Sequence, residues 1–286
     1  MAIDVLSEEI IGRWSETPGV RIVSISGFKQ DVPVDPDKNA AGIAAMTLLK
    51  HLGEESRGLD LKIHKHIRSS NGLGSSASGA TAAVVLVNEL LKTPLEKRDL
   101  IPFAMEGETV ANGVNHGCNV VPALLGGLML IRDIETYDYH RVFTPPGLYV
   151  AVLLPDLVIS KKTAAPGLKS DVSLDDMVHQ SSNLGALIIG MQQGDLGLIS
   201  RSMQDHVIEI QLKHLIPHFD EVKNVALQSG ALGCGISGTG PAVFALCQEK
   251  LQASLVANAM QKVYETNKLA ARSFVCGINH EGTVVK

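Results

Sequence analysis

Two short segments near the start of the chain alternate between apolar and polar residues, which is the period of a half-buried strand. They cover residues 20–25 and 59–64. Between them, turn residues at 35–39 precede apolar positions spaced as on one face of a helix, from Ile43 to Leu49. A longer apolar run over 80–91 predicts a helix with at least one buried face. We expect this helix to lie at the centre of a core.

The rest of the chain also contains both patterns, the alternation of a strand and the apolar spacing of a helix. Helices are predicted over 96–110, 173–191, 195–208, 219–229 and 251–267, and strands over 127–131, 148–154, 242–247 and 272–278. The pattern of apolar and polar residues changes at the consecutive prolines 145 and 146, and no internal repeat is visible. We therefore predict an α+β protein of two domains, residues 1–135 and residues 145–286.

Composition narrows the class of ligand. The chain has 286 residues, 45% of them hydrophobic, and a net charge of −5 without any Lys/Arg-rich block, which argues against a nucleic-acid partner. No apolar run is long enough to span a membrane, and the N-terminus carries Asp4, Glu8 and Glu9 where a signal peptide would be basic. Four scattered cysteines suggest neither disulfides nor a zinc site. We expect a cytoplasmic protein that binds small molecules.

A glycine- and serine-rich segment stands before the predicted helix over 80–91. It reads Gly72-Leu73-Gly74-Ser75-Ser76-Ala77-Ser78-Gly79. Glycines let the backbone approach a ligand closely, and the first turn of a helix leaves N–H groups unpaired, so the junction predicts an anion site. It matches neither a Walker A loop nor a G-x-G-x-x-G turn. The alternative is a turn that only caps the helix.

Two more glycine-rich segments follow, one over 112–127 after Glu108, and one over 233–241. The three segments in this order resemble the motifs of the small-molecule kinase superfamily that includes galactokinase, homoserine kinase, mevalonate kinase and phosphomevalonate kinase. The resemblance extends from about Val20 to the C-terminus and is strongest to homoserine kinases. It implies a mixed α/β nucleotide lobe joined to a ferredoxin-like C-terminal lobe. It also implies ATP-dependent phosphorylation of the L-homoserine hydroxyl to O-phospho-L-homoserine, a step of threonine biosynthesis.

The resemblance assigns the nucleotide contacts. Phosphoryl transfer needs the phosphate charge neutralised and Mg²⁺ held near it. The implied ATP-binding residues are Asn39, Gly72, Leu73, Gly74, Ser75, Ser76, Ala77, Ser237 and Gly238. Either serine hydroxyl of the first segment could reach a phosphate or the metal. An Asn before a helix is as typical of an N-cap as of a nucleotide contact.

The implied catalytic residues are Glu108, Ser76 and His116. Ser76 and Glu108 are the expected Mg²⁺ ligands, because this ion prefers hard oxygen donors. Glu106 is an alternative to Glu108, and a solvated helix position is the alternative to a metal role. His116 and Asn119 are the implied contacts of the acceptor, with the imidazole donating to its carboxylate. No residue stands out as a general base.

The chain departs from the family on the acceptor side. Cys118 stands where the family has Asp, and Ala165 and Leu212 stand where it has Arg, the natural clamp for a carboxylate. Lysines at 161, 162 and 213 are possible substitutes. The family's N-terminal segment with an Asn and an Asp for the acceptor has no counterpart before Met1: either the sequence starts at an internal methionine, or a variant has dispensed with this part of the acceptor pocket. These departures leave open a related kinase with another hydroxylated acceptor, or a nucleotide-binding protein of weak activity. A homodimer is among the expectations; a membrane partner is not.

Overall fold

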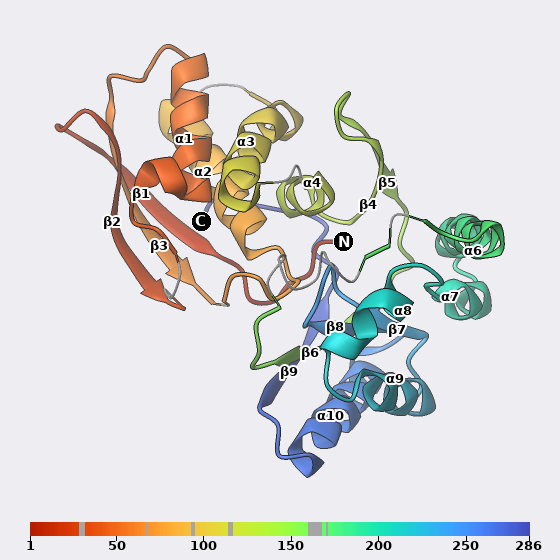
Figure 1. Cartoon of the computed structure of the whole chain (residues 1–286). Coiled ribbons are helices and arrows are strands. Elements are labelled where there is room, and N and C mark those ends of the chain that lie inside the picture. The colour runs from red at the N-terminus through yellow and green to blue at the C-terminus, as the bar shows by residue number, and fades with distance from the viewer. Residues whose placement is uncertain (29–31, 67, 93–94, 114–116, 160–167, 170) are drawn as a thin grey trace. The chain divides into compact units, whose positions relative to one another are not determined.

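The computed structural model describes residues 1–28, 32–66, 68–92, 95–113, 117–159, 168–169 and 171–286. Its contacts divide the chain into two compact units (Figure 1). Unit 1 comprises Met1–Ser69, Gly74–Arg141 and Asn279–Lys286, and unit 2 comprises Ser70–Leu73 and Val142–Ile278. The chain therefore passes from one unit to the other inside the first glycine-rich segment. The segments Ser70–Leu73 and Asn279–Lys286 thus belong to a different unit from the sequence that precedes them.

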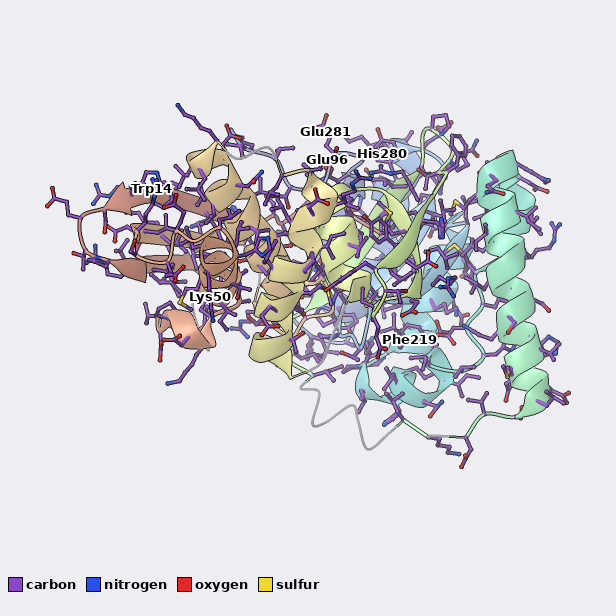
Figure 2. The ribbon with its side chains drawn as sticks, turned by 90° about the horizontal axis from the view of Figure 1, so that it is seen from above. Trp14, Lys50, Glu96, Phe219, His280 and Glu281 are labelled. Atoms are coloured by element: carbon purple, nitrogen blue, oxygen red, sulfur yellow. The ribbon has the colours of Figure 1, made fainter. Side chains whose placement is uncertain are left out.

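A three-stranded sheet forms one layer of unit 1. Its order is β1 (Glu9–Ser15), β3 (Gly58–Lys65), β2 (Gly19–Gly27), with β1 antiparallel and β2 parallel to β3. The strands predicted over 20–25 and 59–64 are confirmed. Strand β1 was missed, because Ile10 and Ile11 are adjacent and Gly12 follows, so the alternation is broken. Trp14 of β1, labelled in Figure 2, packs against the core, with the Arg57 guanidinium 5.1 Å from its ring centre.

Helices α1 (Ala40–His51), α2 (Ser75–Leu91) and α3 (Ile101–Asn112) form the second layer of unit 1. A short η2 helix (Lys97–Leu100) leads into α3, and η1 (Pro36–Lys38) leads into α1. Buried side chains of α1 and α2 share one core with those of β3, among them Leu48, Leu49, Leu59, Leu61, Ala80 and Val84. The central position predicted for the helix over 80–91 is confirmed.

Helix α4 (Gly117–Leu125) and the hairpin of β4 (Leu128–Asp133) and β5 (Asp138–Val142) complete unit 1. Helix α4 lies within the glycine-rich segment over 112–127, where no helix was predicted. The C-terminal residues also belong to this unit. Figure 2 shows His280 and Glu281 near Glu96, and Lys97 Nζ donates to the Glu281 carbonyl at 2.8 Å.

Unit 2 is built on a four-stranded antiparallel sheet. Its order is β7 (Gly233–Ile236), β8 (Val243–Cys247), β6 (Tyr149–Pro155), β9 (Ala271–Gly277). Helices lie between β6 and β7 along the chain, and α10 (Lys250–Thr266) lies between β8 and β9. This is the β-α-β-β-α-β order of a ferredoxin-like fold, as predicted.

The helices before β7 are α6 (Leu174–Gln193), α7 (Leu196–Ser202), α8 (Glu209–Leu212) and α9 (Phe219–Gln228), with η4 (Lys213–Leu215) after α8. A single helix over 195–208 was predicted and is wrong. The chain leaves α7 at Ser202, and the Asp205 carboxylate accepts from the N–H groups of Val207 and Ile208, both at 2.8 Å. This side-chain acceptor favours a turn over continued helix.

None of the helices in the described parts of the chain is long and apolar enough to cross a membrane. The four cysteines carry free thiols; those of Cys234, Cys247 and Cys276 are buried, and Cys118 is exposed.

Candidate functional site

The N-terminus of α2 presents backbone donors beside a glycine. Gly74 is the N-cap residue, with a φ of 70°, and it contributes no side-chain cap. The first bond of the helical pattern runs from Ser78 N to Gly74 O at 3.0 Å. The N–H groups of Ser75, Ser76 and Ala77 precede that bond and point out of the helix end. Together with the positive end of the helix dipole they form an arrangement that suits phosphate.

The predicted loop over 72–79 is longer than the observed one, because α2 begins at Ser75 rather than near residue 80. Only Gly72 and Gly74 of this segment take positive φ values, 85° and 70°. Gly79 is an ordinary helical residue. A Cβ at Gly79 would meet its first neighbour at 3.8 Å, so a close approach of the backbone does not require this glycine.

Ser76 and Glu108 lie in direct contact. Ser76 Oγ donates to Glu108 Oε2 at 2.5 Å, and Glu108 is buried with 2% of its surface exposed. Helix α3 approaches α1 closely one residue earlier, where a Cβ at Gly107 would lie 2.3 Å from the Ala40 carbonyl oxygen. Glu106, the alternative carboxylate, is exposed. Of the two glutamates, Glu108 is therefore the one that the fold places beside the serine.

The neighbouring hydroxyl is directed elsewhere. Ser75 is 3% exposed, and its Oγ donates to Glu8 Oε1 at 2.6 Å. The alternatives left open for the two serines are thus separated by geometry: Ser76 faces Glu108, and Ser75 faces Glu8. The sequence analysis did not single out Glu8 or its partner Lys65, because 57 residues separate them and no motif links them.

The third glycine-rich segment pairs with residues 70–73 inside unit 2. Ser237 Oγ donates to the Gly72 carbonyl at 2.8 Å, and Ala242 N donates to the Asn71 carbonyl at 3.1 Å. A Cβ on Gly72 would lie 2.2 Å from the Ser237 carbonyl oxygen. Gly238, with a φ of 60°, completes the turn. The Ser237 hydroxyl is thus engaged with backbone, and its predicted contact with ATP stays a prediction.

Asn39 acts as the N-cap of α1. Its Oδ1 accepts from Ala41 N at 3.0 Å and Gly42 N at 3.4 Å, and its Nδ2 donates to the Pro33 carbonyl at 2.8 Å. Of the two roles weighed for this residue, the structure contains the capping role. A contact of this side chain with nucleotide, which stays a prediction, would have to compete with these bonds.

Asn119 of α4, a predicted acceptor contact, lies beside the first glycine-rich segment. A Cβ at Gly74 would be 3.5 Å from Asn119 Cβ and Cγ. Cys118 precedes it on the same helix, and desolvation raises the pKa of its thiol, with a smaller contribution from the charge of Glu108. The thiol is therefore neutral at pH 7. His116 lies outside the described residues, as do Ala165 and the lysines at 161 and 162.

Leu212, the remaining position at which the chain departs from the family pattern, lies in unit 2. Leu212 is 1% exposed and belongs to the core formed with Phe219, Val222 and their neighbours. An Arg at this position would place a charge among apolar side chains, so the local environment suits the leucine. Lys213 follows it, and its Nζ binds both carboxylate oxygens of Asp220 at 3.0 Å.

The donor set fits a magnesium ion better than a transition metal. No cluster of three or more His, Cys, Asp or Glu side chains suited to a metal occurs among the described residues. Ser76 and Glu108 offer one hydroxyl and one carboxylate. Mg²⁺ usually takes one or two carboxylates and completes its shell with water and substrate phosphates, so this sparse set of hard oxygens matches it.

The chain is similar to known proteins over nearly its whole length. The family model described as the GHMP kinases N terminal domain matches residues 39–127, and the model described as GHMP kinases C terminal matches residues 187–266. A homoserine kinase of Chloroherpeton thalassium is 37% identical over 270 residues, which cover 92% of this chain and 85% of the relative. A homoserine kinase of Xylella fastidiosa is 34% identical over 274 residues, covering 96% of this chain and 84% of the relative.

Solved structures give the same result. The crystal structure of homoserine kinase from Cytophaga hutchinsonii has a TM-score of 0.95 at 38% identity, covering 98% of this chain and 89% of that one. An L. major mevalonate kinase has a TM-score of 0.73 at 18% identity, covering 96% and 87%, and shows likeness of fold alone. With both family models matched and relatives above 30% identity along most of their length, the chain belongs to the GHMP kinase family, among relatives named homoserine kinase.

Proposed function

We propose that this chain transfers the γ-phosphoryl group of ATP to the hydroxyl of L-homoserine, giving O-phospho-L-homoserine, ADP and a proton. The observation that carries the proposal is the identity of 34% to 38% with homoserine kinases along most of their length. The hydrogen-bonded pair of Ser76 and Glu108 at the N-terminus of α2 supports it, because a phosphotransferase needs hard oxygen ligands beside a phosphate site.

Each part of the chain has a role in this proposal. The N–H groups of Ser75, Ser76 and Ala77 bind phosphate oxygens and stabilise the charge that spreads over them in the transition state. Asn119, adjacent to Gly74, contacts the acceptor. His116 is proposed as the second acceptor contact. The acceptor hydroxyl oxygen forms the new bond to the γ-phosphorus and loses its proton. The bond from the γ-phosphorus to the oxygen that bridges the β- and γ-phosphates breaks, and ADP leaves.

Ser76 and Glu108 would hold Mg²⁺, which fits their oxygen donors. When bound, the ion neutralises charge on the phosphates and keeps them in one orientation. The acceleration then comes from alignment and from electrostatic stabilisation rather than from a dedicated base.

Release of ADP, coupled to a spectroscopic readout, tests the proposal. L-homoserine, L-threonine, mevalonate and galactose should be compared at equal concentration, with and without Mg²⁺. We expect L-homoserine to support turnover at least about tenfold faster than the others, since a site built for polar groups discriminates strongly. Absence of turnover with L-homoserine would reject the assignment.

Two features favour a second candidate, a kinase of the same family with a different acceptor. Leu212 is a core residue, and the Cys118 thiol is neutral, so two positions that carry charge in the family carry none here. Turnover with an acceptor that lacks a carboxylate would support it. Binding of magnesium-ATP without turnover of any acceptor would instead support a nucleotide-binding protein of weak activity.

We further propose that the protein works in the cytoplasm, because both substrates are charged and water-soluble metabolites. Neither a nucleic acid nor a membrane takes part in the proposed reaction. The homodimer stays a prediction, which the molar mass from light scattering would test.

A further inference from the structure

A buried ion pair lies directly beneath the first turn of α2. The Glu8 side chain is 1% exposed and the Lys65 side chain is 6% exposed, and Lys65 Nζ lies 2.7 Å from the Glu8 carboxylate. Lys65 is the last residue of β3, and Glu8 immediately precedes β1. The pair therefore sits at one end of the unit 1 sheet, at the edge from which the chain proceeds towards the first glycine-rich segment.

The same carboxylate is hydrogen-bonded to the start of α2 and lies near Gly79. Its Oε1 accepts from Ser75 Oγ at 2.6 Å, at the first residue of the helix. Its Oε2 would lie 3.8 Å from a Cβ at Gly79, one turn further along. Glu8 thus binds the first residue of the turn whose N–H groups are the proposed phosphate donors. This hydrogen bond links the turn to the residue that immediately precedes β1.

The charges of the pair suit this place. Burying a carboxylate or an ammonium group destabilises the fold unless the group is paired and hydrogen-bonded. Here the Lys65 ammonium and the Ser75 hydroxyl both donate hydrogen bonds to the Glu8 carboxylate. Burial raises the pKa of Glu8, while the charge of Lys65 opposes the rise. A negative charge alone at the helix N-terminus would repel an incoming triphosphate. With Lys65 beside it, the carboxylate can hold Ser75 without presenting net charge to the phosphate site.

We propose that Glu8 and Lys65 are positioning residues for ATP: through the Ser75 hydroxyl they fix the first turn of α2 in the orientation that binds phosphate. The inference rests on the proposed function in one respect, namely that this turn binds the phosphates of ATP. Neither residue touches the nucleotide. Their effect should therefore be seen in nucleotide affinity and in the KM for ATP, more than in the KM for the acceptor.

Four variants separate positioning from stability. Ser75→Ala removes only the hydroxyl that links the pair to α2, and Lys65→Met leaves the Glu8 carboxylate unpaired. Glu8→Gln leaves the Lys65 ammonium unpaired. The double variant Glu8→Gln/Lys65→Met removes both charges but keeps a carbonyl oxygen that can accept from Ser75.

Asp60→Asn is the matched control. Asp60 lies on β3, as Lys65 does, its side chain is 8% exposed, and it accepts from Arg21 at 2.6 Å, yet that contact joins β3 to β2 rather than to α2. This variant also breaks an ion pair of the same sheet whose carboxylate is buried, although the Arg21 side chain is 44% exposed, so a general loss of stability should be common to both sites.

The measurement is the dissociation constant of magnesium-ATP by calorimetry without acceptor, followed by steady-state kinetics and the thermal midpoint. We expect Ser75→Ala and Lys65→Met to weaken ATP binding about three- to tenfold, the range of one lost hydrogen bond. We expect the KM for L-homoserine to change less than about twofold, because the acceptor does not bind to this turn. Glu8→Gln should weaken ATP binding as well, and the double variant should return it to within about twofold of the parent.

Unchanged ATP affinity in a folded Ser75→Ala protein would overturn the inference, even if Lys65→Met failed to fold. An equal loss in Asp60→Asn would overturn it too, because the effect would then follow stability alone. If the parent protein binds no magnesium-ATP, the proposed function fails. If the parent binds it and all variants bind equally well, only the positioning role fails.

Discussion

Ser76 Oγ and Glu108 Oε2 lie 2.5 Å apart, and this hydrogen bond joins the first turn of α2 to the middle of α3. The glutamate is buried, while Glu106 on the same helix is exposed. A buried carboxylate that accepts from a hydroxyl at the N-terminus of a helix offers the hard oxygen ligand that a divalent cation at a phosphate site prefers. The contact therefore leads directly to a test of the metal site.

Glu108→Gln should reduce kcat by about 10²- to 10³-fold, the usual effect of removing one group that stabilises transition-state charge. The neutral amide keeps the size of the side chain but is a poor ligand for Mg²⁺. The measurement is ADP release with L-homoserine over a range of Mg²⁺ concentrations, together with the thermal midpoint to show that the fold persists.

Glu106→Gln is the control for this prediction. It makes the same chemical change two residues away on the same helix, at an exposed position. Activity and magnesium dependence should stay within about twofold of the parent, since exposed substitutions away from a site have small effects. Equal activity of Glu108→Gln and Glu106→Gln would exclude the metal role of Glu108.

The regular elements could be predicted from the sequence wherever one local rule decided the structure. The apolar period gave the helix at 80–91 a central place, and Ser173 was recognised as a helix start; its hydroxyl accepts from Asp176 N at 3.1 Å. Strand β1 and helix α4 could not be predicted in this way. The strand lacks alternation, and α4 begins at a glycine within a segment rich in Gly and Asn, so tertiary contacts overrode propensity.

The residues of the candidate site also differ in whether a local sequence pattern predicts them. The resemblance to family motifs indicated Ser76 and Glu108, because the spacing of these motifs can be read directly from the sequence. Glu8 and Lys65 carry no motif, and they meet Ser75 only because β1 and β3 are neighbours in the sheet. Long-range partners of this kind are set by strand pairing, which a single sequence does not reveal.

Gly72→Ala should destabilise the protein by about 2 kcal/mol or more, because positive φ is strained for a residue with a Cβ and a steric overlap adds to it. The φ is 85°, and the new Cβ would lie 2.2 Å from the Ser237 carbonyl oxygen. The overlap is with backbone, so a side-chain rotation cannot relieve it. Urea unfolding measures the change, and ATP affinity should fall with it. An unfolding free energy equal to that of the parent would contradict this account of the turn.

Gly79→Ala should have the opposite sign. Gly79 lies inside α2, and its Cβ would meet Glu8 Oε2 at 3.8 Å and Ala41 Cβ at 4.0 Å, both ordinary contact distances. Alanine is favoured over glycine in a helix interior, so we expect the unfolding free energy to rise by about 0.5–1 kcal/mol. The same urea experiment provides the measurement. Destabilisation would mean that α2 needs a glycine at position 79 for a reason other than space.

Cys118→Asp should improve the acceptor side of the site. Desolvation raises the pKa of the Cys118 thiol, so at pH 7 this position carries no charge. The homoserine kinase resemblance places a carboxylate here, and Cys118 is the second residue of α4, where the helix dipole favours a negative charge. Attraction between the new carboxylate and the ammonium group of L-homoserine should lower its KM about three- to tenfold, the range of one charge-assisted hydrogen bond.

Cys118→Asn separates charge from shape, because the amide matches the carboxylate in size but remains neutral. It should leave the KM for L-homoserine near that of the parent. The KM for ATP should not improve in either variant. The charge of Glu108 helps to raise the pKa of the Cys118 thiol, and a carboxylate added at this position can only oppose the triphosphate. If Cys118→Asp instead raised the KM for L-homoserine while another hydroxylated acceptor was turned over well by the parent, the second candidate function would gain the support that the first would lose.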